Sequence, residues 1–320
     1  RSKFEKIISK AYCAKGLMKK KDSLIIIVGP TASGKSDFAV RLAKKFNGEI
    51  ISADSRQVYR DLNIGTAKVK GKWKNDVFLY KGVPHFCIDI ASPKSMYTAA
   101  TFKKHAERAM KAIVARRNIP IIAGGTGFWV DALVYDIDLP QVPPNILLRK
   151  KLEKKSTHQL FALLKKIDSR RASHIEQKNP RRLIRAIEIV KAIGRVPPMV
   201  AHNPYHTLWI GISRNDTALR RFITTRAQQM VKQDLVGETK KLLAMGVSKK
   251  RIHEFGFEYV AALDVIEKKL TNDQLIEALV RKTILYAKRQ MRWFSRNSDI
   301  QWVSSFTKAE QLTRTFTKIL

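Results

Sequence analysis

The sequence predicts an α/β protein with a parallel sheet core, an inserted helical domain and a helical C-terminal part. Two observations lead to this prediction. Between residues 23 and 137, short apolar runs rich in Ile and Val alternate with longer helical stretches, a pattern typical of βαβ units on a parallel sheet. A highly charged helical segment then lies between two proline clusters, "LPQVPP" at 139–144 and "GRVPP" at 194–198.

Individual elements follow from hydrophobic periodicity. Short apolar runs predict strands at 24–28, 49–51, 119–123, 207–212 and, as a short extended segment, 300–303. Helical periodicity predicts helices at 35–46, about 98–117 and about 273–294. The last of these helices ends in a basic and aromatic run.

We therefore expect three parts. Residues 23–137 and 206–320 form the α/β core with its C-terminal helices, and residues 138–205 form the helical insertion. Residues 1–22 are basic and lack a strong periodicity. They are interpreted as an N-terminal extension, with three explanations left open: a tail, a remnant of processing, or an additional arm that touches RNA.

Charge is the unusual feature of the composition. The 320 residues include 62 Lys and Arg against 27 Asp and Glu, a formal net charge of +35. Such an excess favours a polyanionic partner, most simply a nucleic acid. The alternative is a general lysine bias on a solvated surface.

Other features of composition exclude several classes of protein. No apolar run approaches the ~18 residues of a membrane span, and no secretory signal is present. The two cysteines, Cys13 and Cys87, do not make a disulfide framework, and no Cys/His cluster has the spacing of metal ligands. We expect a cytoplasmic protein that does not interact with membranes.

A phosphate-binding loop follows the first predicted strand. Residues 29–36, "GPTASGKS", satisfy the pattern G-x-x-x-x-G-K-[ST] completely. Glycines let backbone N–H groups surround an anion, and the following helix adds its N-terminal dipole. Lys35 supplies a positive charge, and the Ser36 hydroxyl can hold Mg²⁺. The anion-binding residues are Gly29, Pro30, Thr31, Ala32, Ser33, Gly34, Lys35 and Ser36. The fold is therefore expected to be P-loop NTPase-like, but an NTPase, a small-molecule kinase and an enzyme of another diphosphate ester all fit this loop.

Two more segments are expected at the same edge of the sheet. Asp54 follows the second predicted strand, whose end we expect beside the phosphate loop. A carboxylate there can be a metal ligand, a substrate anchor or a general base. A structural alternative is that Asp54 caps the next turn. Gln57 has both a donor and an acceptor, which suits contact with the edge of a base. The glycine turn "GGTG" at 124–127 places Thr126 at the same edge, although a plain tight turn explains it equally well.

Taken together and in this order, these segments resemble the tRNA dimethylallyltransferases of the tRNA isopentenyl transferase family. The resemblance extends over "GPTASGKS", "ISADSRQVYRDLNIGTAK", "GVPHFCIDI", "IIAGGTGFW", "NPRRLIRAIEI" and "YAKRQMRWF", and covers most of the chain from about 24 to 303. The zinc-finger tail of eukaryotic relatives is absent from the sequence, which favours the bacterial type.

The resemblance implies transfer of a dimethylallyl group from dimethylallyl diphosphate to N6 of adenosine 37, in tRNAs that read codons beginning with U. The phosphate loop would then hold diphosphate rather than ATP. Asp54 is our candidate for the base, Lys35 and Mg²⁺ on Ser36 would stabilise the leaving anion, and Thr31 would bridge the diphosphate and the base. Arg226 matches a family arginine that reaches the diphosphate.

The resemblance also implies the residues that contact the anticodon stem-loop of the tRNA, whose adenine must be flipped into the site. In the core these are Asp54, Ser55, Arg56, Gln57 and Thr126. In the insertion they are Arg149, Arg181, Arg182, Leu183, Ile184 and Arg185. A solvated basic helix face is the alternative for the arginines. We expect a monomer.

Some positions depart from the family pattern, namely Phe257-Glu258-Tyr259, Arg292 and Ser295. They concern recognition of the tRNA rather than the reaction class. Three other functions remain as alternatives: an adenylate isopentenyltransferase acting on free nucleotide, a P-loop kinase of a small metabolite, and an RNA-binding protein without catalysis.

Overall fold

The computed structural model describes residues 22–202 and 204–318, and the chain divides into two compact units. Of the described residues, the first unit contains 22–135 and 204–318, and the second is Asp136–His202. The insertion expected at 138–205 thus begins and ends two to three residues earlier. The predicted extension, except for Asp22, lies outside the described residues.

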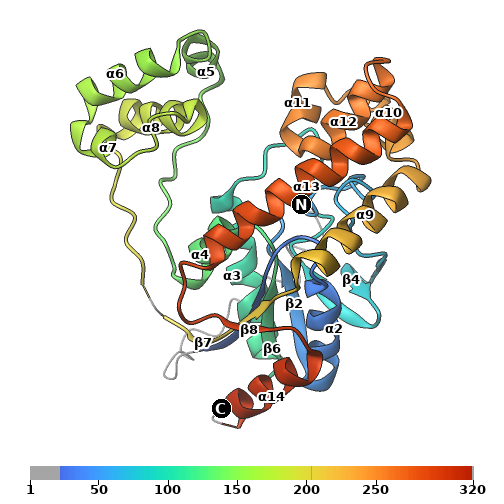
Figure 1. The fold of residues 1–320 in the computed structure, drawn as a ribbon. Helices are drawn as coiled ribbons and strands as arrows, with labels where there is room; N and C mark the ends of the chain where they lie inside the picture. The colour runs from blue at the N-terminus through green and yellow to red at the C-terminus, as the bar shows by residue number, and fades with distance from the viewer. Residues whose placement is uncertain (1–21, 203, 319–320) are drawn as a thin grey trace. The chain divides into compact units, whose positions relative to one another are not determined.

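A sheet of eight strands forms the centre of the first unit among the described residues (Figure 1). Its order is β3-β4-β5-β2-β6-β1-β7-β8. The strands are β1 Ser23–Val28, β2 Gly48–Ser52, β3 Lys72–Lys74, β4 Val77–Tyr80, β5 Val83–Phe86, β6 Ile119–Ala123, β7 His206–Ile212 and β8 Gln301–Val303. From β5 to β8 all neighbours are parallel, whereas β3, β4 and β5 pair antiparallel. The predicted parallel core is confirmed.

Strand β1 is buried on both faces, which explains its continuous apolar sequence. Leu24, Ile26 and Val28 pack into one core with α3, α4 and the C-terminal helices, while Ile25 and Ile27 pack into the other with α2 and α14. The helices of this unit are α2 Lys35–Lys45, α3 Ala99–Ala115, α4 Gly127–Val134, α9 Asp216–Lys232, α10 Leu235–Ala244, α11 Lys249–Phe255, α12 Phe257–Ile266, α13 Asn272–Phe294 and α14 Phe306–Thr317.

The antiparallel edge of the sheet was missed by the sequence analysis. Two-residue turns join its strands: Asn75-Asp76 between β3 and β4, and Lys81-Gly82 between β4 and β5. All four turn residues have positive φ, from 48° to 78°, as tight hairpin turns require. The dipeptides between short apolar runs were the available signal, but both strands of the first hairpin are too short to show alternation.

Strand order changes one expectation about the site. Asp54 was expected beside the phosphate loop, but β6 lies between β1 and β2. The loop that follows β6, "GGTG", is therefore the direct neighbour of the phosphate loop, and Asp54 comes from the strand beyond it. All three loops still leave the same edge of the sheet, because the three strands are parallel.

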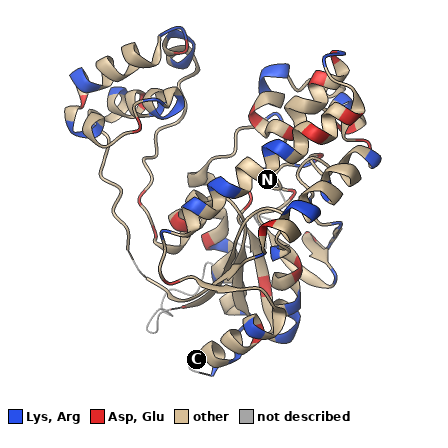
Figure 2. Ribbon diagram, in the orientation of Figure 1, with Lys and Arg blue, Asp and Glu red and all other residues tan. Residues whose placement is uncertain are grey.

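The second unit is helical and has its own apolar core. Its helices are α5 Ile146–Leu152, α6 Thr157–Ile167, α7 Ser169–Ser173 and α8 Pro180–Ile193. Helix α8 begins with Pro180 at its first turn and with the Asn179 side chain accepting from the Arg182 N–H, a standard start for a helix. Leu183 and Ile187 on α8 pack against Leu160 and Leu164 of α6. Lys and Arg lie on the helices of both units (Figure 2).

Candidate active site

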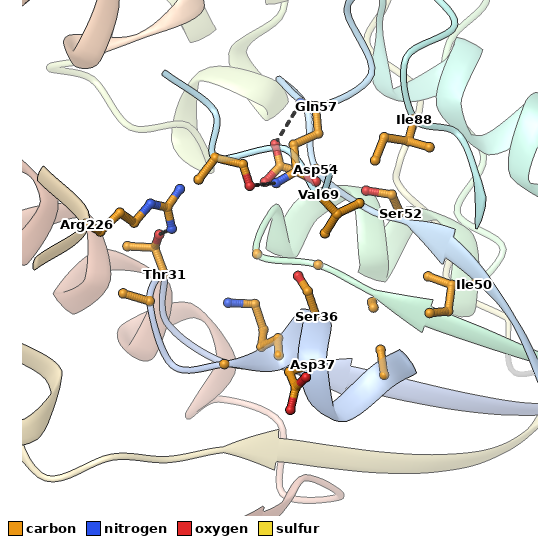
Figure 3. A pocket seen from close by; sticks show the side chains of 18 of the residues that line it. Thr31, Ser36, Asp37, Ile50, Ser52, Asp54, Gln57, Val69, Ile88 and Arg226 are labelled. Carbon is orange, nitrogen blue, oxygen red and sulfur yellow. Dashed lines mark hydrogen bonds between the residues drawn. The ribbon is translucent and has the colours of Figure 1, made fainter. Parts of the chain in front are cut away.

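A cavity of about 370 Å³ lies at the carboxyl edge of the parallel strands in the first unit. Side chains from the phosphate loop, from the segment after β2, and from helices α9 and α13 line it (Figure 3). The phosphate loop contributes Thr31, Lys35 and Ser36, and the segment after β2 contributes Asp54 and Gln57. The structure therefore brings the predicted base and five of the eight predicted anion-binding residues into one cavity: Thr31, Ala32, Gly34, Lys35 and Ser36. The other three, Gly29, Pro30 and Ser33, are not among its lining residues.

The phosphate loop has the backbone conformation that its sequence requires. Gly34 has φ +94° and ends the loop at the first residue before α2. Gly29 has φ +141°, and a Cβ there would lie 2.6 Å from the Ile212 carbonyl oxygen. Among the described residues, the buried Ser33 Oγ has no hydrogen-bond partner. A buried polar atom without a partner suits a loop that receives an anion.

Lys35 lies inside this loop and its Nζ donates to the Pro30 carbonyl oxygen at 2.6 Å. Burial, with a smaller contribution from the neighbouring Arg226, lowers the pKa of this ammonium to about 7, while Asp54 acts in the opposite direction. Lys35 therefore gains or loses its charge within the physiological range of pH, and an arriving anion would favour its protonated form.

Arg226, on α9, spans two of the loops. Its Nη1 donates to Thr31 Oγ1 at 3.0 Å, and its Nη2 donates to the Thr66 carbonyl oxygen at 3.2 Å. Burial lowers the pKa of the guanidinium, although it stays charged because the ordinary value is so high. Arg226 is thus a cationic wall of the cavity, and its contact with the diphosphate stays a prediction. Phe222 and Gln229, on the same face of α9, also line the cavity but were not predicted.

Asp54 has both a structural and a free carboxylate oxygen. Its Oδ1 accepts from the backbone N–H groups of Arg56, at 2.9 Å, and Gln57, at 3.2 Å. This is the turn cap that we considered as an alternative. Among the described residues, Oδ2 has no hydrogen-bond partner, so capping does not prevent Asp54 from accepting a proton in the cavity.

The other residues of this segment hold each other in place. Gln57 Nε2 donates to the carbonyl oxygens of Thr66 and Ala67, at 3.1 and 3.4 Å, which leaves its Oε1 for a ligand. Thr126 Oγ1 accepts from the Ser55 N–H at 3.0 Å. Contact of Gln57, Ser55 and Thr126 with tRNA stays a prediction.

Arg56 is paired with Glu258, one of the residues that depart from the family pattern. Arg56 Nη1 lies 3.0 Å from Glu258 Oε2, and the guanidinium also packs against Gly256. Burial raises the pKa of the Glu258 carboxyl, while Arg56 and Arg226 act against this shift. In this chain the predicted tRNA contact by Arg56 therefore has to compete with an internal carboxylate.

A second carboxylate, Glu238 on α10, anchors the turn that follows the Asp54 segment. It accepts from the N–H groups of Asn63, Ile64 and Gly65 at 2.8 to 3.1 Å, and from the Tyr259 hydroxyl at 2.8 Å. Tyr259, another departure from the pattern, is thus a support for this turn.

Replacing Glu238 with Gln is expected to destabilise the protein by about 2 kcal/mol, because the amide N–H₂ would face donors that are already buried. The free energy of unfolding from urea titration measures this. Glu277→Gln, on the exposed surface of α13, is a matched control and should change stability by less than about 0.5 kcal/mol. Equal stability of Glu238→Gln and the control would contradict this role.

Gln290 and Tyr286, both on α13, were given no defined place in the site by the sequence analysis. Gln290 is only 6% exposed and contacts both the phosphate loop and the "GGTG" turn. Tyr286 lines the cavity, and burial raises its pKa to about 12, so its hydroxyl stays protonated. In the basic and aromatic run that ends α13, Phe294 is in the core and Trp293 Nε1 donates to Asp131 Oδ2 at 2.8 Å.

The residues of the insertion that are predicted to contact tRNA differ in how exposed their side chains are. Leu183 and Ile184 are 0% and 8% exposed and belong to the core of the second unit, so their side chains are not available to RNA. Helix α8 turns its apolar face inward, so contact of these two residues with tRNA stays a prediction for their backbone alone. Arg181 and Arg182 are exposed, and Arg182 lies 3.0 Å from Glu176.

Arg149 and Arg185 flank a buried carboxylate, Glu188. Arg149 donates to it twice at 2.7 Å, and Arg185 lies 3.7 Å from it. Burial opposes ionisation of Glu188, but hydrogen bonds from Arg149 and the Asn145 backbone hold its pKa below the ordinary value. Both arginines therefore stabilise the unit, and their contact with RNA stays a prediction.

Comparisons with known proteins agree with this geometry. The family model described as "IPP transferase" matches residues 57–297, and that described as "Isopentenyl transferase" matches residues 22–74. The chain belongs to the IPP transferase family. A tRNA dimethylallyltransferase of Alkaliphilus oremlandii is 36% identical over 309 residues, which cover 93% of this chain and 97% of the relative.

Two solved structures of IPP transferases are similar over nearly their whole length. The tRNA isopentenylpyrophosphate transferase of Bacillus halodurans is 34% identical with a TM-score of 0.67, covering 93% of this chain and 96% of that one. The corresponding enzyme of Staphylococcus epidermidis is also 34% identical, with a TM-score of 0.65 and coverages of 93% and 99%. The P-loop NTPase-like fold and the family resemblance are confirmed.

Two absences hold for the described part of the chain. No group of three or more His, Cys, Asp or Glu side chains that could hold a metal ion occurs there. No helix in those ranges has the length and apolar character needed to span a bilayer.

Proposed function

We propose that this protein transfers the dimethylallyl group of dimethylallyl diphosphate to N6 of adenosine 37 in tRNAs reading codons that begin with U. The products are N6-dimethylallyladenosine in the tRNA and diphosphate. The observation that supports this most directly is that Lys35, Arg226 and Asp54 line the same cavity, and that one carboxylate oxygen of Asp54 accepts no hydrogen bond from the described residues. One side suits a diphosphate and the other suits a proton-bearing nucleophile.

The bond changes place each residue in a role. N6 attacks the allylic carbon as the bond from that carbon to the diphosphate oxygen breaks. The negative charge of the leaving diphosphate is stabilised by the loop N–H groups, Lys35 and Arg226. The N6 proton passes to Asp54 Oδ2, since an exocyclic amine conjugated with a purine ring is a poor nucleophile unless its proton is removed.

The cavity also has an apolar side that suits the dimethylallyl group. Ala39, Ile50, Val69 and Ile88 line it. An allylic hydrocarbon placed there would be kept from water, which limits hydrolysis of the diphosphate ester. A P-loop kinase has no need of this apolar wall beside its phosphate loop.

Mg²⁺ fits the donors that are present. The Ser36 hydroxyl opens into the cavity (Figure 3), and Mg²⁺ commonly takes one or two protein oxygens while substrate phosphates and waters complete its shell. We propose that Ser36 holds it together with the diphosphate. When bound, the ion supplies positive charge next to the leaving group.

For tRNA, the supporting features are the net charge of +35 and the exposed arginines of the insertion, Arg181 and Arg182. Lys and Arg contacts to phosphates position an RNA, while an unstacked loop base is read in the cavity. We propose that the anticodon stem-loop is the part recognised, and that the protein acts as a monomer in the cytoplasm.

An assay with unmodified tRNA tests the proposed acceptor position. The protein is incubated with Mg²⁺, dimethylallyl diphosphate and the tRNA, and the nucleosides of the digested RNA are identified by mass. N6-dimethylallyladenosine is expected, and it should vanish when adenosine 37 is replaced by guanosine. Product that persists with the guanosine variant would place the reaction at another position.

The lowered pKa of Lys35 predicts that diphosphate binding takes up a proton. Above about pH 7 the free protein carries mostly neutral Lys35, whereas the bound anion favours the ammonium. Affinity for dimethylallyl diphosphate should therefore fall as pH rises from about 7.5 to 9. The ligand itself is already fully ionised in this range, because its terminal phosphate, like that of a phosphate monoester, loses its last proton at about pH 6.

Calorimetry in buffers of different ionisation enthalpy measures the proton uptake directly. At about pH 8 we expect roughly one proton per ligand for the wild type and none from this site in Lys35→Met. Uptake that is the same in both proteins would assign the pH dependence to another group.

A further inference from the structure

Gln290 joins two loops that are distant in the sequence. Its Oε1 accepts from the Thr31 N–H in the phosphate loop at 2.8 Å, and its Nε2 donates to the Gly125 carbonyl oxygen at 2.8 Å. The side chain is 6% exposed and also lines the cavity. A buried amide with both ends bonded is costly to disturb, since either loss leaves an unsatisfied polar group.

The glycine turn is shaped to receive this side chain. A Cβ on Gly125 would lie 2.2 Å from Gln290 Nε2, and the next nearest atom outside Gln290 is 4.0 Å away. Gly125 is not among the glycines with positive φ, so its backbone would accept alanine. The requirement for glycine at this position therefore comes from Gln290 itself.

The contact also changes what the phosphate loop offers to an anion. In loops of this kind, backbone N–H groups point toward the ligand. The Thr31 N–H points to Gln290 instead, and Thr31 Oγ1 accepts from Arg226 at 3.0 Å. Both the backbone and the side chain of Thr31 are thus fixed by residues of other helices.

We propose that Gln290 is a positioning residue: it holds Thr31 and the "GGTG" turn at a fixed separation, so that the diphosphate ester is aligned with the attacking N6. The inference rests on the proposed function, because alignment matters only if a transfer takes place. Small misplacements in a reaction of two bound substrates cost much in rate, about 10²-fold for an error near 1 Å.

Only glutamine has the required chemistry at this length. Glutamate cannot donate to the Gly125 carbonyl and would place a carboxylate oxygen against it. Methionine has a similar size but neither the donor nor the strong acceptor. In Gln290→Met and Gln290→Glu we expect kcat to fall about 10- to 100-fold, while KM for dimethylallyl diphosphate changes less than about 3-fold.

Thr313→Val is the matched control. Thr313, on α14, is fully buried and donates from Oγ1 to the Ala309 carbonyl oxygen at 2.8 Å. The control loses a buried hydrogen bond outside the cavity and should keep the wild-type kcat per folded molecule. A kcat in Gln290→Met within twofold of this control, measured by single turnover with both substrates saturating, would overturn the proposal.

A double-mutant cycle tests the contact itself. Gly125→Ala should reduce kcat because its methyl group displaces Gln290, whereas Gln290→Ala makes room for that methyl group. The double variant should therefore be no slower than Gln290→Ala alone. If the two residues acted independently, the two reductions in kcat would multiply instead. Multiplied losses would overturn the proposal. If the wild type prenylates tRNA, either result concerns Gln290 alone; a wild type without product would refute the proposed function and this inference with it.

Discussion

Asp54→Asn is expected to lower kcat for prenylation of tRNA by about 10²- to 10⁴-fold, the usual contribution of a positioned general base. The physical reason is specific to the unpaired oxygen. Asparagine retains an acceptor for the N–H groups of Arg56 and Gln57, so the turn is preserved. Its amide nitrogen, in place of Oδ2, cannot accept the N6 proton.

Single-turnover rates with saturating substrates measure this effect. Binding of dimethylallyl diphosphate is the control. Removing the Asp54 charge lowers the pKa of Lys35, so affinity is compared at about pH 5.5, where Lys35 is charged in both proteins. There the affinity of Asp54→Asn should equal or exceed that of the wild type, because a negative charge near the anion is removed. Asp54→Ala loses the cap as well, and should also be less stable. A near-normal rate in Asp54→Asn would leave the transferase assignment intact but rule out Asp54 as the base.

Arg226→Lys is expected to reduce kcat/KM for dimethylallyl diphosphate by about 10²-fold, although the positive charge is kept. The guanidinium spans Thr31 Oγ1 and the Thr66 carbonyl oxygen, whereas an ammonium on a flexible stem cannot hold both in the same geometry. The phosphate loop and the Asp54 segment would then lose a shared support.

Arg221→Lys, five residues earlier on α9 and exposed, is the matched control and should stay within about twofold of the wild type. Kinetics over a range of dimethylallyl diphosphate concentrations separate the effects on KM and kcat. If Arg226→Lys behaves like the control, the residue contributes only its charge.

The sequence predicted the parts of the site that depend on local pattern. The phosphate loop, Asp54 and "GGTG" each follow an apolar strand, and parallel pairing brings strand ends to one edge whatever their exact order. The order itself, with β6 between β1 and β2, could not be derived, because it depends on pairing between distant segments.

Contacts between side chains of distant segments could not be predicted from the sequence for the same reason. Gln290 meets Thr31 across 259 positions of sequence, and Glu258 meets Arg56 across 202. No local periodicity indicates such contacts. In the insertion, the family match assigned Leu183 and Ile184 to RNA together with the arginines, although the side chains of these two residues lie in the apolar core.

The central claim is that tRNA, rather than a free nucleotide, accepts the dimethylallyl group. One competition reaction tests this claim most directly. Wild-type protein receives Mg²⁺ and limiting dimethylallyl diphosphate together with unmodified tRNA, AMP and ATP, and mass spectrometry follows all three. We predict dimethylallyl adenosine in the tRNA, with AMP unmodified and ATP unconsumed. Prenylated AMP, or loss of the ATP γ-phosphate without prenylated tRNA, would contradict the account.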